Sequence, residues 1–198
     1  MTLYKNPNKY IGDKFTLDII GAYVAVIRDR FSGIDYGDFP WKFSEEDNKT
    51  RIFIDAGSVD TYEQKDARPG IFINRSSMVF SKLAINNRAA YDVKSDTTDF
   101  YCLGGGQISV DCISKNRGES STLGDIVATH ILMSEDIFRA VLNFRDMSPI
   151  TLGATQPWEK DDRTFVTRVT GEFTYDISWR QIPLAVRLSR IFGSVEPS

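Results

Sequence analysis

The sequence predicts an α+β fold: a mixed or antiparallel β-sheet with two to three helices packed on one face. Two observations support this prediction. Between Phe15 and Phe31, apolar side chains recur at three- and four-residue spacing, which is the pattern of an amphipathic helix. Between Phe165 and Trp179 they alternate almost without fault, which is the pattern of a β-strand with one buried and one wet face.

The helices are placed by their apolar periodicity and by the residues at their ends. Asp13 suits the N-cap of the first helix, and Gly33 is a natural stop after it. A second helix is predicted over residues 119–133 and a short third one over residues 136–144. The polar residues 1–12 are expected to form a flexible lead into a single domain that spans residues 1–198.

The strands are placed by alternation and by the polar segments between them. Strands are expected over residues 51–55, 71–80, 107–114, 150–155 and 165–179. Alternation resumes after a break at Pro183, which predicts a long C-terminal β-hairpin over residues 163–192. Residues 92–99 are expected to form a loop or a disordered tip and residues 157–162 a turn, while the triplet Gly104 to Gly106 suggests a flexible turn or bulge.

The strand from Phe165 to Trp179 is unusual for its length. It would be roughly three times as long as the common strand. Such a strand needs long partners, and it projects beyond a small core unless another element covers it. This favours a subunit of an assembly over a compact, self-contained enzyme.

Composition restricts the class of protein. The chain has 198 residues, of which 41% are hydrophobic and 12% aromatic, enough for one domain with a packed core. Its net charge of −3 argues against nucleic acid as the main ligand, because sequence-independent DNA binders are normally basic. Without a membrane-length apolar run or a secretory signal, we expect a soluble protein with no membrane partner, made in a cytoplasm. Cys112 is expected to be a buried free thiol, and a disulfide between Cys102 and Cys112 is the alternative that a reducing compartment disfavours.

The residues that usually carry catalysis or bind metals are sparse. His130 is the only histidine, and it lies on the apolar stripe of the second helix, where a packed histidine is the simpler interpretation. One histidine and two cysteines cannot supply a familiar zinc cage or a histidine-dependent triad. The set Asp55, Glu63 and Lys65 only loosely resembles a metal-dependent nuclease site. We therefore predict no enzymatic activity, no cofactor and no metal.

Charged and aromatic residues along the C-terminal hairpin are candidates for subunit contacts. Large aromatic side chains and arginine dominate the energetics of interfaces. The candidates are Trp158, Arg163, Arg168, Glu172, Asp176, Trp179, Arg180 and Arg187. A solvated, charge-balanced strand face is the simpler explanation for the charged members, and core packing explains the two tryptophans equally well.

Residues 106–127, GQISVDCISKNRGESSTLGDIV, resemble the middle of tailed-phage neck proteins, especially tail terminators and tail-completion proteins. Those proteins show a strand of the form x-Ile-x-Val-x-apolar-x-Ser/Ala-Lys, a turn containing Glu, and a helix with Leu-x-x-x-Val spacing. An opening amphipathic helix and a late long β-hairpin also resemble that family. This chain is longer than many members, with extra sequence over residues 39–69.

The resemblance implies a virion protein, assembled in the host cytoplasm, that forms a homo-oligomeric ring, commonly a hexamer. Such a ring closes a tail tube or joins tail to head, and its partners are other neck proteins and the tube or sheath protein. Genomic DNA would only pass through the lumen, which an acidic balance suits because a basic lining would retard DNA. The alternatives are a stopper, collar or baseplate protein, or a small α+β enzyme or ligand-binding domain.

Overall fold

The computed structural model describes residues 15–33, 37, 39–46, 48–57, 68–82, 88–92 and 97–181. The strands are β1 Phe53–Ala56, β2 Gly70–Lys82, β3 Arg88–Asp92, β4 Thr97–Ser114, β5 Phe144–Leu152, β6 Gln156–Trp158 and β7 Asp161–Gln181. They form one seven-stranded sheet in the order β1-β2-β4-β7-β5, with β3 pairing with β4 and β6 with β7. The sheet is mixed, because β1 runs parallel to β2 while the other pairs are antiparallel.

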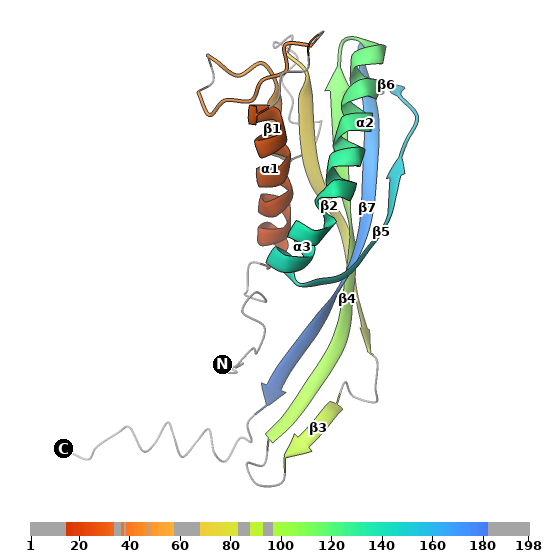
Figure 1. Ribbon diagram of the computed structural model, residues 1–198. Helices are drawn as coiled ribbons and strands as arrows, with labels where there is room; N and C mark the ends of the chain where they lie inside the picture. Colours follow the sequence, from red (N-terminus) through yellow and green to blue (C-terminus); the bar gives the residue numbers. More distant parts are fainter. Residues whose placement is uncertain are drawn as a thin grey trace, which may run out of the picture.

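Three helices cover one face of this sheet: α1 Phe15–Gly33, α2 Arg117–Met133 and α3 Glu135–Leu142 (Figure 1). The predicted α+β class is therefore confirmed, and each predicted helix is present within two residues of its expected start and end. The Asn116 side chain caps α2 by accepting hydrogen bonds from the backbone of Gly118 and Glu119. Among the described residues, no helix is long and apolar enough to cross a bilayer.

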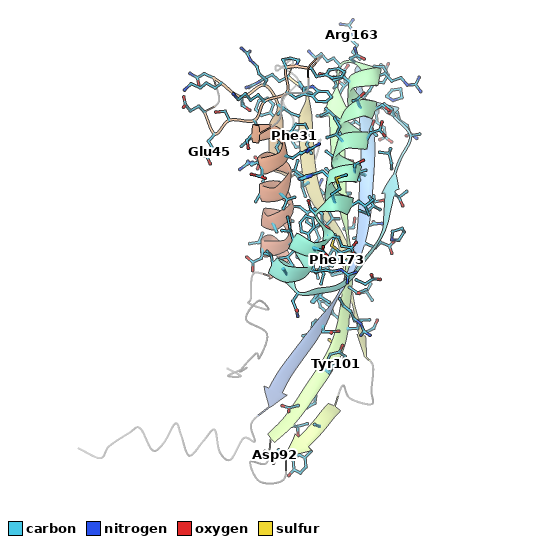
Figure 2. The ribbon with its side chains drawn as sticks, viewed as in Figure 1. Phe31, Glu45, Asp92, Tyr101, Arg163 and Phe173 are labelled. Atoms are coloured by element: carbon cyan, nitrogen blue, oxygen red, sulfur yellow. The ribbon has the colours of Figure 1, made fainter. Side chains whose placement is uncertain are left out.

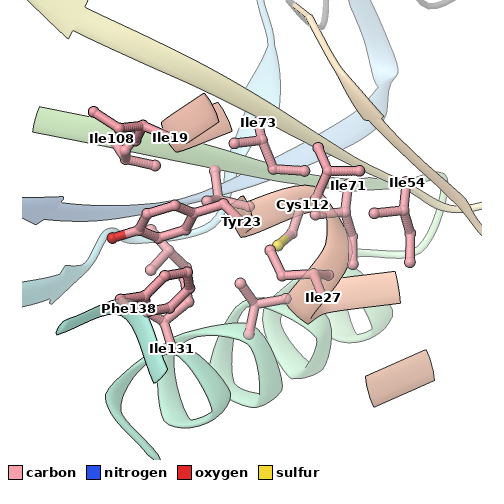
Figure 3. Packing of buried hydrophobic residues seen from close by; sticks show 14 of the residues in the cluster. Ile19, Tyr23, Ile27, Ile54, Ile71, Ile73, Ile108, Cys112, Ile131 and Phe138 are labelled. Carbon is pink, nitrogen blue, oxygen red and sulfur yellow. The ribbon is translucent and has the colours of Figure 1, made fainter. Parts of the chain in front are cut away.

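The core lies between the helices and the sheet. From α1, Ile19, Tyr23 and Ile27 are buried at the three- and four-residue spacing seen in the sequence. They meet the inward side of β2 and β4 and the side chain of Phe138 from α3, which stacks on Tyr23 with ring centroids 4.2 Å apart (Figure 3). Each large side chain buried in this way contributes roughly 1.5–3 kcal/mol through the hydrophobic effect.

The alternation along the longest strand is reproduced by its burial. In β7, Thr167, Val169 and Phe173 are buried on the helix side, while Arg168 and Glu172 are exposed on the opposite face. The long partner that this strand needs is β4, which pairs with it from Ser114 opposite Phe165 to Thr98 opposite Gln181. The second half of the predicted hairpin, residues 182–192, lies outside the described residues, as does the predicted lead 1–12.

The prediction of a turn or bulge at the glycine triplet was wrong. Gly104, Gly105 and Gly106 lie within β4, in continuous register with β7 and opposite residues 78–80 of β2. Two of these glycines leave room for aromatic rings. A Cβ at Gly104 would lie 2.5 Å from Cζ of Tyr175, and one at Gly106 would lie 2.8 Å from Cζ of Phe173. Two aromatic rings on β7 thus occupy the space where β4 side chains would stand.

Several element boundaries also differ from the predictions. The predicted loop over residues 92–99 is shorter, because Asp92 ends β3 and Thr97 already begins β4. Strand β5 begins at Phe144 instead of residue 150. Phe144 and Met147, which precede Pro149, are both buried against the core and form part of the strand. The predicted turn 157–162 narrows to Glu159 and Lys160 between β6 and β7.

Candidate assembly surface

The sheet is longer than the helical layer that covers it. Beyond the helices, residues 78–82 of β2, 97–105 of β4 and 174–181 of β7 continue with β3 as a narrow, twisted extension, which we call the arm (Figure 1). Figure 2 places Phe173 where the body narrows, Tyr101 within the arm and Asp92 close to its far end. No described helix covers either face of the arm.

The arm joins the body through an aromatic stack. The ring of Phe173 lies parallel to that of Phe144 from β5, with centroids 4.6 Å apart and an angle of 8° between the planes. Tyr175 follows at 6.1 Å from Phe173, on the same face of β7. Because Gly104 and Gly106 leave room for these rings, β4 and β7 stay close together where the helices end. The arm is thus anchored in the core.

On the opposite face, the arm is fixed by a polar cluster. The hydroxyl of Tyr101 donates a hydrogen bond to the Asp176 carboxylate, whose Oδ1 lies 3.6 Å from Nη1 of Arg145. This hydrogen bond favours the protonated phenol and raises the pKa of Tyr101. The cluster ties β4, β7 and the start of β5 together just beyond the last residues that β5 pairs.

Large apolar side chains are exposed on the arm. Val79 is 62% and Phe80 61% exposed, and Tyr91 on β3 is 47% exposed. A second exposed apolar group lies at the end of α2 and along α3 and comprises Leu132, Met133, Ile137 and Val141. Large apolar side chains exposed in this way are candidates for contacts with another protein.

Two predicted interface candidates lie at the end of the molecule opposite the arm. Trp158, on β6, packs on the helix-free face of the sheet against a small cluster that contains Phe72 and Ile113. Arg163 is exposed near the start of β7, at the far end from Asp92 in Figure 2. Trp158 therefore covers part of a core, and neither residue belongs to the arm.

Among the candidates in the middle of β7, Arg168 already has a partner within the chain. Its Nε donates to Oδ1 of Asp111 at 2.6 Å and its Nη2 to Oδ2 at 3.0 Å. Asp111 is only 3% exposed, and this bidentate hydrogen bonding raises the pKa of Arg168. Glu172 is exposed on the same face.

The remaining candidates are Asp176, Trp179, Arg180 and Arg187. The first three lie on the β7 segment of the arm, where Trp179 pairs with Phe100 and Arg180 with Asp99 of β4. Arg187 lies outside the described residues. The structure therefore spreads the described members of the predicted set over the end of the body opposite the arm, the middle of β7 and the arm itself. Sequence reasoning missed Val79 and Phe80, although they stand next to each other in a predicted strand, where two consecutive apolar residues cannot share one buried face.

The histidine and the two cysteines, which could have carried chemistry, are packed within the fold. His130 is half-buried, with Nε2 3.1 Å from the carbonyl oxygen of Val26, and desolvation lowers its pKa. Cys102 and Cys112 are free and buried, and burial raises the pKa of both thiols. The described residues include no cluster of three or more histidine, cysteine or acidic side chains that could hold a metal ion.

A hollow of about 310 Å³ lies between α1, the segment after Trp41 and β1. Arg28, which is the basic side chain among the described residues that line it, donates from Nε and Nη2 to the carbonyl oxygen of Ile54, at 3.0 and 2.8 Å. The Arg28 guanidinium also lies 4.9 Å from the ring centroid of Phe43 and 3.7 Å from Asp55. These contacts join β1 to the helical layer.

No protein-family model matches the chain, and comparison with curated proteins finds no relative. Function is therefore inferred from the arm and from the resemblance of residues 106–127.

Proposed function

We propose that this protein is a structural subunit that assembles into a homo-oligomeric ring at the neck of a tailed bacteriophage. The ring, a hexamer in this proposal, closes the tail tube or joins tail to head and performs no catalysis. The observation that carries the proposal is the arm: a β-sheet extension, anchored in the core by Phe173, that exposes Val79 and Phe80 beyond the helical layer.

Physical chemistry supports assembly over a monomeric role for the arm. Exposed strands with apolar side chains are prone to pair with other chains, and a partner subunit removes that liability. A contact between two different surfaces, repeated around a closed axis, generates a ring. The net charge of −3 suits a channel through which DNA passes without sticking. The resemblance of residues 106–127 to tail terminators supports a position at a phage neck.

The test is the solution mass of the purified chain, measured by light scattering over a range of concentrations, with and without isolated tail tubes. The proposal predicts a species near six times the 22.4 kDa chain mass and co-sedimentation with the tubes. A monomer under every condition, with no binding to tubes, would contradict it. A ring that forms but ignores tubes would retain the assembly role and remove the position at the neck.

Two substitutions on the arm extend this test. Trp179→Ala and Arg180→Glu are expected to impair assembly more than they impair folding of the isolated chain. The measurement is the melting temperature of the diluted protein beside its mass at high concentration. If the substitutions reduce the melting temperature of the diluted protein as strongly as they reduce assembly, these residues support the monomer fold instead.

A further inference from the structure

One face of the arm continues the sheet face that the helices cover in the body. Residues that pair across two strands point to the same face, and alternate residues of one strand share a face. The register through β4 therefore places Phe80, Tyr91 and Ile177 on the same side as the buried Val110. We call this side of the arm its inner face. The polar cluster of Tyr101 and Asp176 lies on the other face.

The inner face is apolar but incompletely covered. Phe80 is 61% and Tyr91 47% exposed, and Ile177 is only partly buried, whereas Val110 in the body is fully buried under the helices. From the row of Phe80 and Gly104 to the row of Thr98 and Gln181, the face extends over six residues of β4, which is about 20 Å. An apolar sheet face normally packs against a second layer.

The segment of chain that follows β7 starts at this face. Strand β7 ends at Gln181, opposite Thr98 in the arm, and residues 182–192, which lie outside the described part of the chain, come directly after it. Most of these residues are apolar, unlike the mainly polar residues 1–12 before α1. The segment after β7 therefore has both the position and the composition to cover the inner face.

The spacing of its apolar residues predicts an amphipathic helix over residues 183–192. Five of them share one side of such a helix, at three- and four-residue spacing: Leu184, Ala185, Leu188, Ile191 and Phe192. Arg187 and Arg190 fall on the opposite side. Pro183 suits the first helical position and Gly193 the stop. A ten-residue helix is about 15 Å long, which matches the length of the inner face.

A second strand, as in the predicted hairpin, fits the same residues less well. Strand alternation would place Arg190 on the side of Leu184 and Leu188, and Ile191 on the side of Arg187. The helix leaves Val186 as its one apolar residue on the polar side. A strand beside β7 would also leave the inner face uncovered.

We propose that residues 183–192 form a helix that turns back after Gln181 and packs on the inner face of its own arm, over β4 and β7. The short connection keeps this segment at a high effective concentration beside that face. A helix about 10 Å wide covers about two strands, so the β2 side of the arm, with Val79 and Phe80, stays open for the contacts of the proposed ring. The packing itself does not require the ring.

Cross-linking within one chain tests the proposed contact. In a Cys102→Ser background, which removes the native thiol opposite Ile177, Ile177→Cys is combined with Leu188→Cys or with Val186→Cys. The dilute, unassembled protein is treated with a short bis-maleimide. We expect a cross-link within the chain for Leu188→Cys and none for Val186→Cys, which faces solvent on the helix. Equal yields would indicate a strand, and no cross-link would show that the segment lies elsewhere; either result overturns the proposal. A product that joins two differently tagged chains would also overturn it, because the segment would then cover a neighbouring copy.

A second pair of variants measures what this helix does for the arm. Leu188→Ser removes an apolar contact with the inner face, and Val186→Ser is the matched control two residues away. In the dilute protein, we expect Leu188→Ser to speed amide hydrogen exchange at residues 97–103 of β4 by about tenfold or more, because the arm then opens more readily. Val186→Ser should leave the exchange unchanged. Equal effects, or none, would overturn the helix, while the mass of the wild-type protein tests the proposed ring separately.

Discussion

The body and the arm of this protein use the same two long strands in different ways. In the body, β4 and β7 are covered by helices, and Val110 and Val169 are almost inaccessible to solvent. In the arm, the same strands continue without a second layer, and exposed Val79 and Phe80 lie beside them. A sheet usually needs a packed face to be stable. The arm therefore depends on its anchor in the body and, in our proposal, on neighbouring copies.

The largest effect is expected from a cavity in the body. Phe138→Ala removes a fully buried ring that stacks on Tyr23, and should lower the free energy of unfolding by about 3–5 kcal/mol. Urea denaturation followed by circular dichroism measures this loss. Ile137→Ala, on the exposed side of the same helix, is the matched control and should cost far less. Similar losses for the two variants would show that α3 does not pack as described.

The ion pair between Arg168 and the buried Asp111, on the helix-free face of the body, should contribute to stability. Arg168→Met leaves the carboxylate of Asp111 buried without its bidentate partner and should cost about 1–3 kcal/mol. The double variant Asp111→Val with Arg168→Met removes both charges and should recover much of that loss. Thermal or urea unfolding of the wild type, the single variants Arg168→Met and Asp111→Val, and the double variant forms a complete cycle. Additive losses would indicate that the two side chains do not interact.

The junction between body and arm is tested by the glycines of β4. Gly104→Val places a side chain within the ring of Tyr175 and is expected to cost about 1–3 kcal/mol through overpacking. Gly105→Ala is the control, because its added Cβ would meet only ordinary contacts at 3.5 Å or more, and it should change stability by less than ~0.5 kcal/mol. Chemical unfolding measures both. If Gly104→Val were as neutral as Gly105→Ala, the aromatic anchor would not be as we describe it.

The smallest effect is a pH dependence within the body. Burial lowers the pKa of His130 in the folded state, so the unfolded chain binds the proton more tightly. This part of the stability is present above the unfolded pKa of about 6.5 and is lost as pH falls below it. Between about pH 7.5 and pH 5.5, the melting temperature of the wild type should therefore fall slightly more than that of His130→Gln. If the wild type and His130→Gln showed the same pH dependence of the melting temperature, His130 would not contribute to the pH dependence of stability.

The sequence predicted the body well and the arm poorly, for a physical reason. Apolar residues at regular spacing, such as Ile19, Tyr23 and Ile27, indicate which side of an element packs against the core. This spacing was enough to predict the helices and the long strand. The glycines of β4 were misread, since their function depends on rings from β7 that are distant in the sequence. The exposed pair Val79 and Phe80 was overlooked because strand edges are set by pairing order, which alternation does not encode.

The comparison between body and arm is tested most directly by amide hydrogen exchange at two protein concentrations, one below and one above the assembly midpoint. Our account predicts that the amides of arm residues 78–82 and 176–181 that point away from β4 exchange rapidly in the dilute sample and gain protection in the concentrated one, because neighbouring copies then cover them. The amides of the helix-covered core should be protected equally in both. Arm protection that does not change with concentration, in a sample whose mass does change, would contradict assembly through the arm.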